Sequence, residues 1–144
     1  MIKNEKQYRI TRAQVRRFED ALTELAKESR PANITPRLWQ AQHDGAASQL
    51  QDLRDQVNAY ERLQMGKNKG LVLEAVEDLP KTLIRARIAA GMTQEGLASR
   101  LGVKTQQVQR YEATEYESAS FARICKVVQA LGLRMPRPVR LVRQ

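Results

Sequence analysis

The sequence predicts an all-α protein, with an N-terminal helical hairpin followed by a C-terminal domain of five short helices. Apolar residues recur at spacings of three and four residues through its longer segments, the period of an amphipathic helix. Hydrophobic residues make up 42% of the 144 residues but aromatic residues only 5%, which favours an aliphatic, helical core. In the second half, capping residues and glycines punctuate these segments as helix starts and stops.

The charge of the chain is uneven along its length. The net charge is +9 and the pI about 10.1, a balance that favours a polyanionic partner. Residues 1–78 hold 13 Lys or Arg and 12 Asp or Glu, whereas residues 79–134 hold nine and four. Residues 135–144 add three arginines and no acid. The basic character therefore belongs to the second half, and the nearly neutral first half should serve another purpose.

Several classes of protein are disfavoured by what the sequence lacks. A single cysteine excludes an intrachain disulfide framework, and no apolar run approaches the ~20 residues of a membrane span. The N-terminus has no apolar signal-peptide core, so we expect a soluble, cytoplasmic protein. We find no nucleophile–base pair, no glycine-rich phosphate loop and no cluster of metal ligands around the one histidine, His43. We therefore expect no enzyme, no cofactor and no metal site.

The first predicted helix runs from Thr11 to about Lys27. Thr11 and Gln14 fit a capping box, in which the two side chains satisfy each other's backbone amides. The break at residues 30–33 contains a proline and an asparagine. Apolar residues along this helix form one stripe: Val15, Phe18, Leu22 and Leu25.

The second predicted helix is long, from Pro36 to about Met65, with Thr35 as its cap. Its apolar positions alternate at spacings of four and three, which gives a narrow heptad-like seam. These positions are Trp39, His43, Ala46, Leu50, Leu53, Val57 and Tyr60. The seam packs either on the first helix or against a second chain, and a helix with several faces can do both. For the second possibility, the candidate interface residues are Trp39, Leu50, Leu53, Val57 and Tyr60.

A hinge is expected between the two predicted domains, and a basic tail follows the second. The run of glycine, lysine and asparagine at residues 66–70 is the expected hinge, so the hairpin domain covers residues 1–70. Residues 71–78 form either a short helix or an extended linker, and the second domain runs from 71 to 134. In the basic tail, 135–144, Pro136 and Pro138 forbid a helix, which leaves disorder or an edge strand.

The second domain contains short helices with clear boundaries. The expected helices are Pro80–Ala90, Gln94–Leu101, Lys104 or Thr105 to Ala113, and Phe121–Leu131, with a less defined turn between Glu112 and Ser118. Thr93 and Ser120 are the expected N-caps. Glycines 91, 102 and 132 follow three of these helices, where a left-handed residue commonly ends a helix. The last helix should bury a face made of Phe121, Ile124, Val127, Val128 and Leu131.

The helices at 94–101 and 104–113 are joined by a tight Gly-Val turn, the pattern of a helix-turn-helix. On the second of them Val108 and Tyr111 point to one side. The opposite side carries Gln106, Gln109 and Arg110, with Thr105 at its leading end. Glutamine can bond adenine bidentately and arginine can bond guanine in the same way. Gln94, at the start of the preceding helix, and Lys104 are placed for DNA phosphates.

Arg87 falls among Leu83, Ile84 and Ile88, on or beside a stripe that should be buried. A buried guanidinium is costly unless it is paired, and Glu112 at the core-facing edge of the third helix is the natural partner. The alternative is that Arg87 extends its head group to solvent.

Residues 79–133 resemble the lambda-repressor-like family of DNA-binding domains, of the Xre and Cro type. The resemblance rests on the pattern R-I-x-x-G-M-T-Q-E-x-L-A-x-x-L-G-V-x-x-x-x-V-x-x-Y-E, followed by S-F-x-x-I-x-x-V-x-x-A-L-G. It implies that Gln94 grips the DNA backbone, that Thr105, Gln106 and Arg110 enter the major groove, and that Arg87 pairs with Glu112. A homodimer on a palindromic operator would follow.

Helices ahead of such a domain also look like the HigA group of antitoxins, which neutralise a toxin and repress their own operon. That resemblance implies an antitoxin with a toxin protein as its partner. The alternative is a stand-alone transcriptional regulator whose N-terminal helices serve dimerisation.

Overall fold

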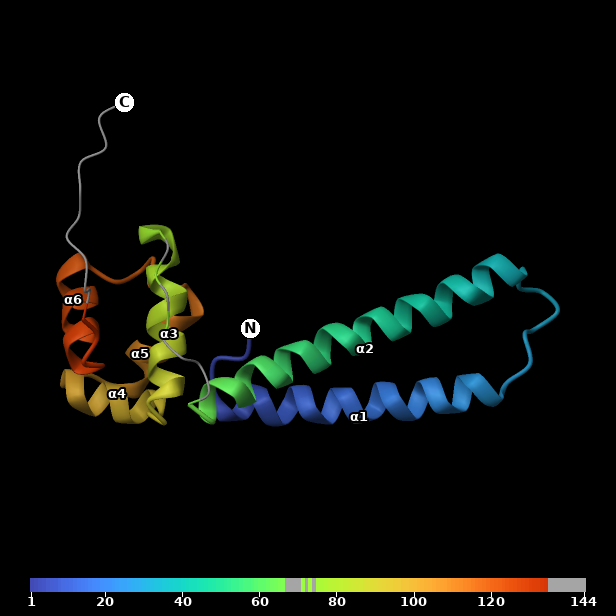
Figure 1. Ribbon diagram of the computed structural model, residues 1–144, viewed down its shortest axis with the longest axis horizontal. Helices are drawn as coiled ribbons and strands as arrows, with labels where there is room; N and C mark the ends of the chain where they lie inside the picture. The colour runs from blue at the N-terminus through green and yellow to red at the C-terminus, as the bar shows by residue number, and fades with distance from the viewer. Residues whose placement is uncertain (67–70, 72, 74, 135–144) are drawn as a thin grey trace, which may run out of the picture. The chain divides into compact units, whose positions relative to one another are not determined.

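The computed structural model describes residues 1–66, 71, 73 and 75–134 (Figure 1). The chain divides into two compact units, Met1–Lys67 and Asn68–Gln144. All regular structure in the described residues is helical: six α-helices, one 3₁₀ helix and no strand. The predicted all-α class is therefore confirmed. Apart from Gly66, the expected hinge at 66–70 lies outside the described residues, as does the basic tail at 135–144.

The first helix, α1, spans Glu5–Lys27 and begins six residues earlier than the sequence suggested. Asn4 is its N-cap, and the Asn4 side chain accepts a hydrogen bond from the backbone N–H of Gln7 at 2.9 Å. The predicted capping box at Thr11 is wrong. Thr11 lies inside the helix and is buried. Its hydroxyl donates a hydrogen bond to the carbonyl oxygen of Gln7, one turn earlier.

The second helix, α2, spans Pro36–Gln64, close to the predicted range. The Thr35 side chain caps it by accepting from the backbone N–H of Leu38, and Pro36 occupies its first turn. The helix continues through Gly45 without a break. Figure 1 shows α1 and α2 as an antiparallel hairpin whose helices diverge towards the connecting loop.

The hairpin core lies where its helices are closest. Leu50, Leu53 and Tyr60 of the predicted seam are buried there, and Tyr8 of α1 stacks on Tyr60 with ring centroids 5.1 Å apart. These three seam residues are already covered within the chain. Trp39 and Val57 remain half-exposed, so they are the members of the candidate interface set that a partner can still reach.

The divergence of α1 and α2 leaves the outer half of the hairpin partly uncovered. In α1, Phe18, Leu22 and Leu25 are only half-buried. In α2 the His43 ring packs edge-on against Trp39, with centroids 4.9 Å apart, and the His43 Nε2 atom is buried without a hydrogen bond among the described residues. A two-helix hairpin has too little apolar surface to close its own seam, as its size predicts.

The second unit begins with a 3₁₀ turn and continues with four short α-helices. Residues 71–78 were expected to be either helical or extended, and the 3₁₀ helix η1 shows that their last three residues are helical. Each α-helix begins and ends within a residue of its predicted bounds, and the segment between α5 and α6 is a turn. The elements are η1 (Val76–Asp78), α3 (Leu79–Ala89), α4 (Gln94–Leu101), α5 (Thr105–Ala113) and α6 (Phe121–Ala130). The glycines that follow α3, α4 and α6 have φ values of 63°, 64° and 65°, the left-handed conformation that a C-terminal stop requires.

The core of the second unit gathers one apolar face from each helix. Its largest fully covered aliphatic residues are Leu83, Ile84, Leu97, Val108 and Val127. The Arg100 guanidinium of α4 donates to the carbonyl oxygen of Ala130 at 3.0 Å and so ties α4 to the end of α6. The predicted burial of Phe121 is wrong, because 77% of its surface is exposed. Phe121 is the first residue of α6, so no preceding turn of the helix lies beside it.

Tyr116, in the turn after α5, is buried although its neighbours are polar. Both Glu115 and Tyr116 have positive φ, 48° and 63°, a conformation that costs energy in residues other than glycine. The Tyr116 ring stacks on Tyr111 at 6.2 Å, and this contact helps hold the turn. Burial, followed by the nearby Glu112 carboxylate, raises the pKa of the Tyr116 hydroxyl. The hydroxyl is therefore neutral, and it has no hydrogen-bond partner among the described residues.

We expect Tyr116→Phe to raise the free energy of unfolding by about 1 kcal/mol, because it removes a buried hydroxyl that forms no hydrogen bond. Urea unfolding of both proteins, followed by circular dichroism, measures the difference. A loss of stability would show that the hydroxyl makes a favourable interaction in solution.

Candidate nucleic-acid interface

Helices α4 and α5 form the two arms of a helix-turn-helix. The Thr93 side chain caps α4 by accepting from the backbone N–H of Gly96 at 3.0 Å. At the other end, Gly102 adopts the left-handed conformation, and the N–H of Val103 bonds back to the carbonyl of Ala98 at 3.0 Å. These closed bonds make a short, rigid turn. The direction of α5 relative to α4 is therefore fixed by local backbone bonding.

The two sides of α5 differ sharply. Val108, Tyr111 and Glu112 are buried on the side that faces the core. Gln106, Gln109 and Arg110 are exposed on the opposite side, while Lys104 is exposed and Thr105 half-exposed at the leading end. The structure thus brings these five predicted DNA-contacting residues to one open side and one end of the same helix. Their amide and guanidinium groups are suited to base edges and phosphates.

Two positively charged side chains lie on this surface. Neither Lys104 nor Arg110 forms an ion pair with any acidic residue in the described part of the chain. Lys104 precedes α5 as its N-cap residue and makes no side-chain capping bond. Both side chains are therefore available to an anionic partner in contact with α5.

Behind this surface, Arg87 and Glu112 form a buried, bidentate ion pair. The Arg87 Nε donates to Glu112 Oε1 at 2.5 Å, and a terminal guanidinium nitrogen donates to Oε2 at 2.8 Å. Exposure is only 3% for the Arg87 side chain and 0% for Glu112. Arg87 therefore does not reach to solvent. Its other terminal nitrogen donates to the carbonyl oxygen of Met92, at 2.7 Å, in the turn between α3 and α4.

Gln94 joins the same network, which the sequence analysis missed. Its side-chain amide donates to Glu112 Oε2 at 2.8 Å, and Gln94 is itself buried. The predicted role of Gln94 was to hold a DNA phosphate, yet its side chain supports α5 from within the domain. Arg87 already gives each carboxylate oxygen one donor, but a carboxylate oxygen can accept more than one hydrogen bond, so Oε2 can also take the Gln94 amide.

The network therefore links three helices through the Glu112 carboxylate, and Arg87 also binds the turn between α3 and α4. Arg87 comes from α3, Gln94 from α4 and Glu112 from α5. Since Glu112 lies one turn from Val108 and two residues after Arg110, its bonds set how far α5 is rotated. That rotation decides whether Gln106, Gln109 and Arg110 face outward. A buried polar network of this kind specifies one arrangement, because every alternative leaves a charge unpaired.

Two other kinds of site find no support in the part of the chain that the structure describes. No group of three or more His, Cys, Asp or Glu side chains is placed there to hold a metal ion. None of the described helices combines the length and the apolar character needed to cross a membrane.

Comparison with known families agrees with this geometry. Residues 83–136 match the family described as helix-turn-helix, a range that begins within α3 and takes in α4, α5 and α6. The hairpin lies outside the match. No curated protein and no solved structure matches the chain. The second unit thus contains, at residues 83–136, a lambda-repressor-like helix-turn-helix domain of the Xre type, a family of DNA-binding transcription regulators.

Proposed function

We propose that this protein is a sequence-specific repressor that binds operator DNA as a homodimer. The observation that carries the proposal is the exposed side of α5, where Gln106, Gln109 and Arg110 stand together on a helix locked by a buried ion pair. In this proposal α5 enters the major groove, Arg110 bonds a guanine and the glutamines bond adenines. Lys104 and the start of α4 hold the neighbouring phosphates.

Dimerisation follows from the size of the reading surface. Helix α5 has nine residues and reaches only a few base pairs. Two copies related by a two-fold axis would read a palindromic operator with half-site centres about 10 base pairs apart, which multiplies the specificity.

The first test measures binding to the DNA upstream of the gene that encodes this chain, by fluorescence anisotropy at a fixed salt concentration. We expect binding that is at least about a thousandfold tighter than to random DNA of equal length, the lower range for specific complexes. Footprinting should protect a two-fold symmetric site. Equal affinity for both DNAs would contradict a sequence-specific repressor.

We further propose that the hairpin binds a toxin, which would make the protein an antitoxin that also represses its own operon. The support is the resemblance to the HigA group in domain order, together with an apolar stripe on the hairpin that the chain leaves half-exposed. Co-expression with the product of the adjacent reading frame tests this role. A stable complex that contains both proteins is expected, whereas separate elution would favour the stand-alone regulator.

We expect Lys104→Ala to weaken binding to operator and random DNA by similar factors, because a lysine at the start of α5 would contact phosphate and not a base edge. The slope of log affinity against log salt should fall in magnitude by about one unit. Anisotropy titrations at several salt concentrations measure both quantities. A loss confined to the operator would instead assign Lys104 to base recognition.

A further inference from the structure

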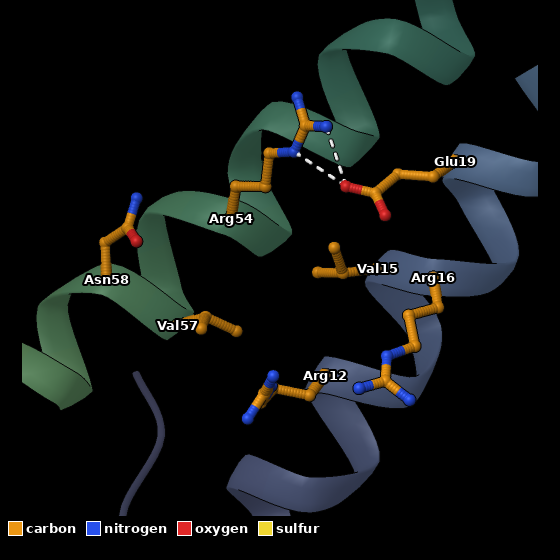
Figure 2. A pocket seen from close by; sticks show the side chains of 7 residues that line it. All are labelled: Arg12, Val15, Arg16, Glu19, Arg54, Val57 and Asn58. Carbon is orange, nitrogen blue, oxygen red and sulfur yellow. Dashed lines mark hydrogen bonds and ion pairs between the residues drawn. The ribbon is translucent and has the colours of Figure 1, made fainter.

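A cleft between α1 and α2 is not used by the DNA-binding proposal. Its volume is about 210 Å³, enough for two neighbouring side-chain groups of a partner but not for a folded element. Its lining residues are Arg12, Val15, Arg16, Glu19, Arg54, Val57 and Asn58. Figure 2 shows Val15 and Val57 between Arg54 on one side and Arg12 and Arg16 on the other. The cleft therefore has an apolar floor with guanidinium groups around it.

The charges around the cleft do not cancel. Arg54 bonds Glu19 at 2.7 Å, and this pair is partly exposed, at 47% and 41%. Arg12 lies over the ring of Tyr8, 5.7 Å from its centroid, and donates to the Tyr8 hydroxyl at 3.3 Å. Neither Arg12 nor Arg16 pairs with an acidic side chain within the described ranges. Two positive charges thus remain beside two half-exposed valines.

From this arrangement we infer that the cleft receives an acidic side chain of a partner protein together with an adjoining aliphatic group. A carboxylate pairs with Arg12 and Arg16, and the aliphatic group covers Val15 and Val57. The inference rests on the partner-binding role proposed for the hairpin, and it specifies the surface that such a partner must present.

Two other possible occupants of the cleft, a DNA phosphate and a second copy of the chain, fit it less well. A DNA phosphate would satisfy the guanidinium groups but leave both valines in water. A second copy of the chain, packed cleft to cleft about a two-fold axis, would bring arginines against arginines. An acidic and apolar protein surface matches both the charge and the floor.

The test uses the full chain and a probe peptide, an acetylated and amidated hexamer of alternating glutamate and leucine. Binding is followed through the Nε–Hε signals of the arginine side chains by NMR. Three further probes separate the contributions: the peptide with glutamine for glutamate, the peptide with serine for leucine, and inorganic phosphate. A short random DNA duplex reports whether nucleic acid reaches Arg12 and Arg16. The variants are Arg12→Gln, Arg16→Gln and, as a matched control, Arg17→Gln, an exposed arginine of α1 that does not line the cleft.

We expect saturable shifts of the Arg12 and Arg16 signals with the acidic peptide, and affinity about fivefold or more lower for each substituted peptide. Arg12→Gln and Arg16→Gln should each weaken binding by about the same factor, whereas Arg17→Gln should leave it unchanged. No saturable shift, equal binding of the glutamine peptide, or larger shifts with phosphate or DNA would overturn the inference. Operator binding by the same variants is measured in parallel. If the neighbouring gene product co-purifies while the peptide fails to bind, the antitoxin proposal stands and the cleft is not its docking point.

Discussion

Replacing Arg87 with alanine is expected to lower the free energy of unfolding of the helix-turn-helix domain by about 3–5 kcal/mol, the usual cost of breaking a buried ion pair from one side. The variant would take two charge-assisted hydrogen bonds from the buried Glu112 carboxylate, while the Gln94 amide would still donate to it. It would also remove the hydrogen bond that holds the α3–α4 turn through the Met92 carbonyl. Urea unfolding followed by circular dichroism measures the loss, and hydrogen exchange of the α3–α6 amides locates it.

The matched control is Arg85→Ala, an exposed arginine of the same helix, which should change stability by less than about 0.5 kcal/mol. The double variant Arg87→Met with Glu112→Leu removes both charges at once and should recover much of the loss, because no buried charge remains unpaired. An Arg87→Ala protein as stable as the original would show that the ion pair does not hold the domain together in solution.

Local sequence signals predicted the second domain almost to the residue. Thr93, Ser120 and the glycines at 91, 102 and 132 act through their immediate neighbours, by capping a helix or by adopting positive φ. These effects need no knowledge of the rest of the fold. The start of α1 shows the limit of such reasoning. Asn4 and Thr11 are both acceptable caps, and the choice of the earlier one buries Thr11 and adds a further turn and a half of helix.

Features that depend on packing could not be predicted from spacing alone. Phe121 fits the apolar period of α6, but periodicity does not say whether anything covers the first turn. Similarly, the amide of Gln94 and its position at the start of a helix are typical of a phosphate contact. Its hydrogen bond to Glu112 depends instead on how α4 and α5 pack together. In the hairpin, the seam of α2 predicted an apolar contact. How far the two helices diverge is a property of the pair, so the half-exposure of Trp39 did not follow from the sequence.

The stability of the network and the DNA-reading function are connected through one helix. Glu112 lies on the inner side of α5 and Arg110 on the outer side, and both are fixed to the same rigid backbone. A substitution that weakens the inner contacts would also blur the position of the outer ones. Binding defects of network variants must therefore be separated from those of surface variants, which leave the fold intact.

Replacing Arg110 with alanine should isolate the contribution of the reading surface. We expect a loss of about 1–3 kcal/mol in binding to the operator and relaxed preference at one base position per half-site, the effect of removing a bidentate arginine–guanine contact. The loss of binding free energy to random DNA should be far smaller. Because Arg110 is exposed and forms no ion pair among the described residues, the melting temperature should stay close to that of the original protein. Anisotropy titrations on the operator, on its single-base variants and on random DNA measure the change.

Two control variants, each of which also removes one positive charge, separate base recognition by Arg110 from a general effect of charge. Lys104→Ala removes one positive charge near the same helix and should lower both affinities together, whereas Arg85→Ala, on α3, should lower neither by a comparable amount. If Arg110→Ala weakened operator and random DNA equally, Arg110 would be a phosphate contact. Base recognition would then have to come from Gln106 and Gln109, the remaining outward amides of α5, and alanine at each of them should shift the preferred base instead.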